Sequence, residues 1–171
     1  MVSSSPAARK STAGTRPTSW SPQRAAAQRT ALDGLARLLA HTRHERIVIS
    51  GGPRCGKSTL GGKLRLDGYK LHHGEELEGL EWSAASERAS RWLDESGPWI
   101  CENVAMARAL RKWLARNPTG LPADLFIQLD HHVVEPLPGQ HSMRAGCTTV
   151  WEKIEPELVR RGAKILRARH P

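Results

Sequence analysis

The sequence lacks the features that mark membrane, secreted and disulfide-stabilised proteins. No apolar run approaches the roughly 20 residues that cross a bilayer, so no membrane partner is expected. The first 20 residues are basic and rich in Ser and Thr without an apolar centre, which excludes a secretory signal. A disordered tail is favoured there over a transit peptide of similar composition. The cysteines form no Cys-x-x-Cys pair, which indicates reduced thiols in a cytoplasmic compartment: Cys55, Cys101 and Cys147.

The positive charge is concentrated at the two ends of the chain. The net charge is +9, and residues 1–46 carry eight Lys and Arg against two acidic residues. Five more basic side chains fall in the last dozen residues, whereas the middle is nearly balanced. Basic ends commonly contact polyphosphates such as DNA or RNA. A solubilising tail and a solvated helix are the alternative interpretation.

Strand and helix patterns alternate along the chain. Short apolar runs predict five strands, within residues 46–50, 68–73, 96–103, 123–130 and 163–168. Alternation with helices implies a mostly parallel sheet covered on both faces. The predicted fold class is therefore α/β, with about five strands flanked by helices. The predicted organisation is a basic tail over 1–20 and a single domain over 21–171.

Capping residues and apolar stripes predict the helices. Ser21 followed by Pro22 suits the start of the first helix, and Ser83 resembles the cap of a helix that ends near residue 94. The Pro-, Gly- and His-rich stretch 131–149 is predicted to be an irregular loop. A last helix over about 150–161 contains Pro156, which is expected to kink it or to mark its true start.

The stretch "GGPRCGKS" matches the phosphate-binding pattern G-x-x-x-x-G-K-[ST] in full, between a predicted strand and a predicted helix. Glycines let the backbone curl so that its N–H groups and a helix N-terminus face phosphate oxygens. The lysine supplies a charge for the β- and γ-phosphates, and Ser58 offers a hydroxyl to Mg²⁺. The expected cofactors are ATP and Mg²⁺, within a P-loop NTPase fold. The expected ATP-binding residues are Gly51, Gly52, Pro53, Arg54, Cys55, Gly56, Lys57, Ser58 and Thr59.

Other signatures of nucleotide-driven machines are missing. The sequence has no Asn-Lys-x-Asp motif for guanine, no long apolar strand ending in Asp-Glu and no second large domain. The histidines show no zinc spacing, and no metal other than Mg²⁺ is expected. In a chain this small, a kinase that phosphorylates a small acceptor or an exposed hydroxyl is the better fit.

Several further segments resemble one group of small P-loop kinases found largely in bacteriophages. The similar segments are "HHGEEL", "EWSAAS", "RWL", "GPWICEN", "RALRKWL" and the later "PGQ…M…G", within residues 46–162. The resemblance implies an adenylate-kinase-like enzyme or a 5-hydroxymethyluracil DNA kinase, which acts on the route to hypermodified thymidine. It also implies DNA as partner and the cytoplasm of an infected bacterium as location. Where the group carries Asp-Asp, this chain has Glu75-Glu76.

An alcohol acceptor loses its proton as the phosphoryl group arrives, so the acceptor side needs a base or an orienting carboxylate. Glu75 and Glu76 follow the second predicted strand and are candidates for that base, of which one is expected to act. A solvated acidic turn is the alternative. Glu102 ends the third strand, where ligands of open α/β sheets bind. It is expected to bind the acceptor, to orient Mg²⁺ through water, or to cap the next helix; Asp130 has the same position on the fourth strand.

Three other side chains are candidates for contacts with the substrates. Arg144, within the predicted loop, is expected to act as a lid arginine that stabilises the transferring phosphoryl group, with Gly139 and Gly146 as hinges. Arg108 and Arg111 suit an acceptor phosphate or the DNA backbone, or else a solvent-facing surface. Trp82 is expected either to stack on a flipped base or to pack in the core.

Three hypotheses follow from the sequence. The first is a kinase that acts on a hydroxymethyl group of a pyrimidine in DNA. The second is a nucleoside or nucleotide monophosphate kinase acting on free substrates, which needs the same loop, a carboxylate and arginines. The third is an ATP-binding accessory protein without acceptor chemistry, for which Glu75, Glu76 and Glu102 are dispensable.

Overall fold

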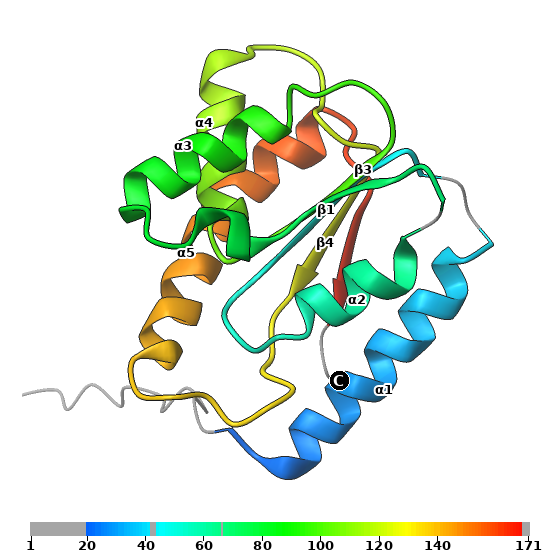
Figure 1. Cartoon of the computed structure of the whole chain (residues 1–171), viewed down its shortest axis with the longest axis vertical. Coiled ribbons are helices and arrows are strands. Elements are labelled where there is room, and N and C mark those ends of the chain that lie inside the picture. The colour runs from blue at the N-terminus through cyan, green and yellow to red at the C-terminus, as the bar shows by residue number, and fades with distance from the viewer. Residues whose placement is uncertain (1–19, 42–43, 66, 169–171) are drawn as a thin grey trace, which may run out of the picture.

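Five strands form one fully parallel sheet in the computed structural model, which describes residues 20–41, 44–65 and 67–168. The strand order is β2-β3-β1-β4-β5 (Figure 1). The expected α/β class with a five-stranded sheet flanked by helices is thus confirmed. The strands are β1 (Arg46–Gly51), β2 (Lys70–His72), β3 (Trp99–Glu102), β4 (Leu125–Leu129) and β5 (Ile165–Ala168).

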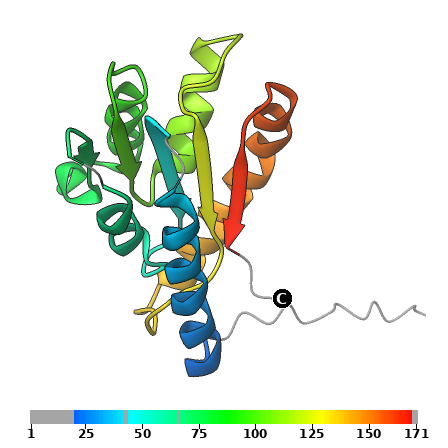
Figure 2. The same cartoon turned by 90° about the vertical axis from the view of Figure 1, so that its right-hand side faces the viewer.

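The central strand β1 is apolar on both faces because helices cover both. Ile47 and Ile49 belong to the cluster under α1 (Pro22–Leu39) and α2 (Lys57–Leu64). Val48 points the other way, into the larger cluster under α3 (Trp82–Trp92), α4 (Met106–Arg116) and α5 (Gln140–Arg160). Alternate side chains of a strand face opposite ways, so this split follows from the period of two. Figure 2 shows the two helical layers on either side of the sheet.

The first helix begins as predicted. Ser21 is the N-cap of α1, its hydroxyl accepts a hydrogen bond from the Arg24 N–H at 3.2 Å, and Pro22 occupies the first turn. The predicted tail over 1–20 lies, Trp20 apart, outside the described residues. Among the residues that the structure describes, none of the helices combines the length and the apolar character needed to cross a membrane.

Three expectations about helix ends are wrong. Helix α3 starts one residue before Ser83, which therefore lies in its first turn rather than at the cap. Residues 140–149 are helical, not an irregular loop, because α5 begins at Gln140 after Gly139 turns the chain with a φ of 82°. Gly146 is a helical residue rather than a loop hinge. Pro156 lies inside α5, so it does not mark the start of the helix, and the kink expected there stays a prediction.

Pro156 is tolerated because of where it lies on the helix. Its ring removes the N–H that would bond to the carbonyl of Glu152. Both residues are exposed, so water can bind the carbonyl that is left without a donor. The buried side of α5 meanwhile packs Trp151, Ile154 and Leu158 against the sheet.

Candidate functional site

Strand order places a ligand crevice between the ends of β1 and β3. These two strands are neighbours, with Ile49 aligned to Glu102. The chain leaves β1 through α2 on one face of the sheet and leaves β3 through α4 on the opposite face. Loops that diverge in this way open a crevice at the carboxyl ends of the strands, where ligands of such sheets bind. The glycine-rich loop follows β1 at this point.

The glycine-rich loop makes two backbone approaches that only glycine permits. Gly51 has a φ of 152°, and a Cβ on it would lie 2.7 Å from the carbonyl oxygen of Leu129. A Cβ on Gly52 would lie 2.5 Å from the Cβ and 2.8 Å from the Cα of Arg144. Helix α5 therefore packs directly on the loop, through residues that the sequence placed in an irregular segment.

Lys57 is held inside the loop that it is expected to serve. Its side chain is only 7% exposed, and its Nζ donates a hydrogen bond to the Gly52 carbonyl at 2.6 Å. Burial lowers the pKa of Lys57, whereas the nearby Glu102 charge acts in the opposite direction. A phosphate oxygen can replace the Gly52 carbonyl as acceptor of this N–H, with a stronger charge-assisted bond.

The first turn of α2 presents its hydroxyls to solvent. Ser58 and Thr59 are both exposed directly after Lys57, where α2 begins. Beneath the loop, Cys55 is fully buried, and burial raises the pKa of its thiol to about 11. The thiol is therefore neutral at physiological pH and adds no negative charge under a phosphate site.

The segment after β4 braces the loop from outside. The imidazole Nδ1 of His132 lies 2.8 Å from the Pro53 carbonyl, and the Val133 N–H donates to the Arg54 carbonyl at 2.7 Å. The Arg54 guanidinium donates to the Glu135 carbonyl at 2.9 Å. From α1, Arg29 donates to the Val133 carbonyl at 2.6 Å. These long-range bonds fix the loop between α1 and the segment 130–139. His132 was missed because its role depends on a contact 79 residues away.

Arg144 reaches the loop from a helix rather than from a mobile lid. It lies in the second turn of α5, and its Nη1 donates to the Asp130 carbonyl at 2.7 Å. Its Nε is buried and has no hydrogen-bond partner among the described residues. One N–H of this half-buried guanidinium beside Gly52 therefore has no partner among the described residues. Asp130 is half-buried and directly follows β4. Its carboxylate Oδ1 accepts a hydrogen bond from the side-chain amide of Gln128 at 3.2 Å.

Glu102 stands across the crevice and is tied to the acceptor side. Its carboxylate is 3% exposed, and Oε1 lies 3.1 Å from Nδ1 of His73. It does not cap α4, because Asn103 Oδ1 accepts the Ala105 N–H at 2.6 Å instead. A Cβ on Gly61 of α2 would lie 3.6 Å from Glu102 Cγ, so the carboxylate borders the helix that follows the loop.

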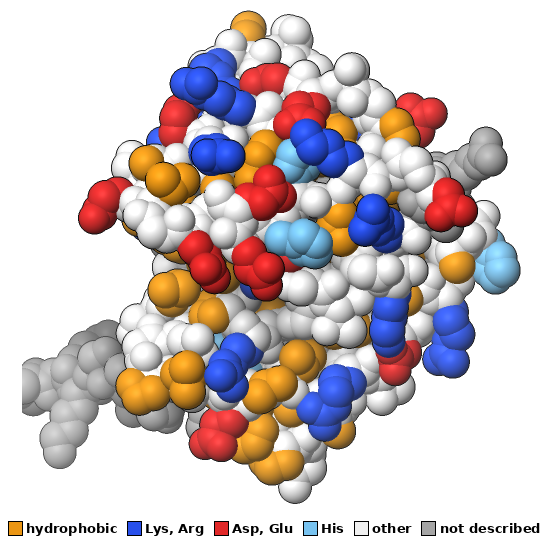
Figure 3. All heavy atoms as spheres, viewed as in Figure 1, with side chains coloured by type: hydrophobic (Ala, Val, Ile, Leu, Met, Phe, Trp, Pro, Cys, Tyr) orange, Lys and Arg blue, Asp and Glu red, His pale blue; other side chains and the backbone are white. Residues whose placement is uncertain are grey.

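The two candidate bases differ in their surroundings. Both lie in a short 3₁₀ turn, η1 (Gly74–Leu77), that follows β2, and both are exposed. Glu76 Oε1 accepts the backbone N–H of His73 at 2.9 Å, which makes it a local cap. The carboxylate of Glu75 forms no hydrogen bond or ion pair with the described residues. Figure 3 shows acidic side chains beside histidine in the middle of this face, over the segment of β2 and η1.

The aromatic and basic candidates separate into surface and core. Trp92 and Trp113 are buried, as their helix positions predict. Trp82 is half-buried at the start of α3, and the Arg108 guanidinium lies over its ring, 5.3 Å from the centroid. That contact is a cation–π pair, which leaves the N–H donors of Arg108 in the plane of the guanidinium. Arg111 is exposed.

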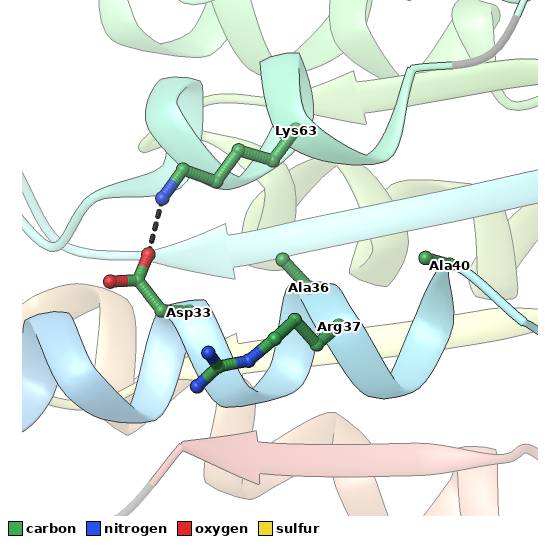
Figure 4. Close-up of a pocket in the computed structure, with 5 residues that line it drawn as sticks. All are labelled: Asp33, Ala36, Arg37, Ala40 and Lys63. Carbon is green, nitrogen blue, oxygen red and sulfur yellow. Dashed lines mark hydrogen bonds and ion pairs between the residues drawn. The ribbon is translucent and has the colours of Figure 1, made fainter.

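A separate hollow of about 400 Å³ lies between α1 and α2, away from the crevice. It is lined by Ala36, Arg37 and Ala40 and closed on one side by the ion pair between Asp33 and Lys63 (Figure 4). None of these residues belongs to the predicted site. Comparison with protein-family models and with curated proteins finds no match to this chain.

Proposed function

We propose that the chain is an ATP-dependent P-loop kinase. Its acceptor is the hydroxymethyl group of 5-hydroxymethyluracil in phage DNA, a step in thymidine hypermodification that helps viral DNA evade host restriction. One observation carries the proposal: a glycine-rich loop with a buried lysine faces a buried carboxylate, Glu102, across one crevice. Phosphoryl transfer to an alcohol needs both a phosphate clamp and an acid-base group on the acceptor side.

The donor side fits ATP and Mg²⁺ by its chemistry. Backbone N–H groups of the loop, the N-terminus of α2 and Lys57 bind the phosphates. Ser58 holds Mg²⁺ through an exposed hydroxyl, a hard oxygen ligand of the kind this ion prefers. When bound, Mg²⁺ neutralises charge on the phosphate oxygens. Arg144 donates its unpartnered Nε–H to the transferring group, which spreads negative charge over three oxygens.

The start of α1 lies at the edge of the sheet that carries the loop, which suits a polymeric acceptor. Ala168, the last residue of β5, is aligned with Leu129 of β4, and Leu129 is aligned with Gly51 of β1. Strand β5 therefore ends at the edge of the sheet that carries the glycine-rich loop. Helix α1 begins at the same edge (Figure 1). Its Arg29 donates a hydrogen bond to the Val133 carbonyl in the segment after β4. The exposed Arg24, in the first turn of α1, thus lies at the crevice edge, where a DNA backbone would pass, whereas Arg160, Arg161 and Lys164 precede β5 at the opposite edge.

A kinase for free nucleotides is the second candidate. Figure 3 shows Lys and Arg interspersed with Asp and Glu on the visible face rather than gathered into one basic surface. A mixed surface suits a small substrate held by a few charged groups better than a long polyanion. The loop, Glu102 and Arg144 would act in the same way on such an acceptor.

The test uses ATP labelled at the γ-phosphate. The protein is incubated separately with DNA that contains 5-hydroxymethyluracil, with ordinary DNA and with free nucleoside monophosphates. We expect label in the modified DNA alone. Label confined to free nucleotides contradicts the DNA assignment, and label in no acceptor despite ATP binding supports an accessory protein that uses ATP as a switch.

Removal of residues 1–19 is expected to weaken DNA binding more than catalysis. The deletion removes three basic side chains, Arg9, Lys10 and Arg16, but spares Trp20, which is half-buried. Each lost phosphate contact reduces the steepness of the plot of log K against log salt by about 0.9. The value of kcat at saturating DNA is expected to stay unchanged. A matched variant with these three residues changed to Gln keeps the length and is expected to behave in the same way. Unchanged affinity and slope would exclude the tail from the DNA contact.

A further inference from the structure

We propose that His73 is the group that accepts the proton of the acceptor hydroxyl, with Glu102 as the residue that orients it. The inference rests on the proposed kinase function and assigns its acid-base chemistry. His73 follows β2 at the edge of the sheet that carries the crevice. Its side chain is 40% exposed, whereas that of Glu102, 3.1 Å away, is 3% exposed. The pair thus joins a buried carboxylate to an imidazole that solvent and substrate can reach.

The hydrogen bond selects the tautomer of His73. A carboxylate oxygen can only accept, so Nδ1 carries the hydrogen and donates it to Glu102 Oε1. Nε2 is then left with its lone pair. A carboxylate that holds one ring nitrogen of histidine both fixes the ring and stabilises the imidazolium that forms when the other nitrogen takes a proton.

The balanced step is a direct transfer. The hydroxymethyl oxygen forms a bond to the γ-phosphorus as the bond from that phosphorus to the β,γ-bridging oxygen breaks, and ADP leaves with that electron pair. The hydroxyl proton moves to His73 Nε2 and then to water, which reaches the half-exposed ring. No oxidant or further co-reactant takes part.

The glutamates of η1 suit the step less well. Glu76 accepts the His73 backbone N–H at 2.9 Å and lies 3.6 Å from Nδ1 of His72, so it holds the start of the turn. No contact among the described residues fixes the side chain of Glu75. Among the described residues, the charged and titratable groups beside His73 are Glu102 from β3, Glu75 and Glu76 from η1, and His72 from β2. His72 is buried against Trp92.

The test compares His73→Asn with His41→Asn in the whole chain. The amide introduced by His73→Asn can still donate to Glu102 but cannot take a proton, so we expect kcat for phosphoryl transfer to fall about 10²-fold with KM for ATP unchanged. The acid limb of the pH profile of kcat is expected to vanish with it. His41 is exposed beyond the end of α1, and its variant is expected to keep full activity.

A second measurement does not depend on activity. Nitrogen-15 NMR of the unchanged protein is expected to show His73 as the neutral Nδ1–H tautomer near pH 8, and Glu102→Leu is expected to abolish this preference. An Nε2–H tautomer, or a His73→Asn variant that keeps kcat and the acid limb, would overturn the assignment. Transfer to no acceptor by the unchanged protein overturns the kinase function itself, and the proton role with it.

Discussion

Replacement of Lys57 by Ala is expected to lower the rate of phosphoryl transfer about 10³-fold, the upper range for loss of one group that stabilises transition-state charge. Lys57 is buried within the glycine-rich loop, so no other cation of α2 can take its place. The other lysine of the helix, Lys63, is turned outward and paired with Asp33 (Figure 4). Initial rates with labelled ATP, measured at saturating acceptor, give the change.

The variant also tests how the loop is held before ATP binds. Without Lys57, the Gly52 carbonyl loses the donor that lies 2.6 Å away. An unpaired buried acceptor costs about 1–3 kcal/mol, whereas removal of the buried ammonium, whose pKa burial lowers, stabilises the fold. Because the two effects oppose each other, we expect a similar free energy of unfolding and one cooperative transition. Lys63→Ala removes a charge from an exposed site on the same helix and is the matched control, with rate unchanged. Transfer at the original rate by the Lys57 variant would refute phosphate binding by this loop.

The main features of the fold were predictable because they depend on local patterns. Ile47 to Ile49 are apolar without interruption, as in a strand covered on both faces, and Ser21-Pro22 carries its own start signal. The N-terminal part of α5 was not predictable in this way. Residues 138–146 contain two glycines and a proline, yet a helix begins at Gln140 and packs on the glycine-rich loop where Arg144 meets Gly52. Tertiary contacts there override a weak local preference.

The two halves of the candidate site differ in the same respect. The glycine-rich loop is a contiguous motif, whose residue types follow from the backbone they must form. The acceptor side is assembled from β2 and β3, so the pairing of His73 with Glu102 depends on strand order, which the sequence does not encode locally. The one available signal was that His73 directly follows a strand and Glu102 ends one, at the carboxyl edge of the sheet where ligands bind. Glu76 shows what charge alone leaves out, because its carboxylate also accepts the backbone N–H of His73; its role as a base stays a prediction.

Replacement of Gly52 by Ala is expected to separate the glycine-rich loop from α5 and to weaken ATP binding at least tenfold. The added Cβ would lie 2.8 Å from the Cα of Arg144, a backbone atom that cannot move without the helix. Overpacking of this kind costs about 1–3 kcal/mol, and displacement of the loop moves the N–H groups and Lys57 that bind phosphate. The dissociation constant of ATP, measured by calorimetry beside the free energy of unfolding, reports both effects.

Gly62→Ala is the matched control for this substitution. Gly62 is exposed on α2, has no atom within 4 Å of its would-be Cβ, and is not part of the loop. Because Ala favours a helix over Gly, this variant is expected to gain about 0.5–1 kcal/mol of stability with ATP affinity unchanged. If Gly52→Ala lowers the free energy of unfolding while Gly62→Ala raises it, the contact between Gly52 and Arg144, rather than helix propensity, causes the loss of stability. Equal ATP affinity in both variants would mean that α5 does not set the shape of the loop.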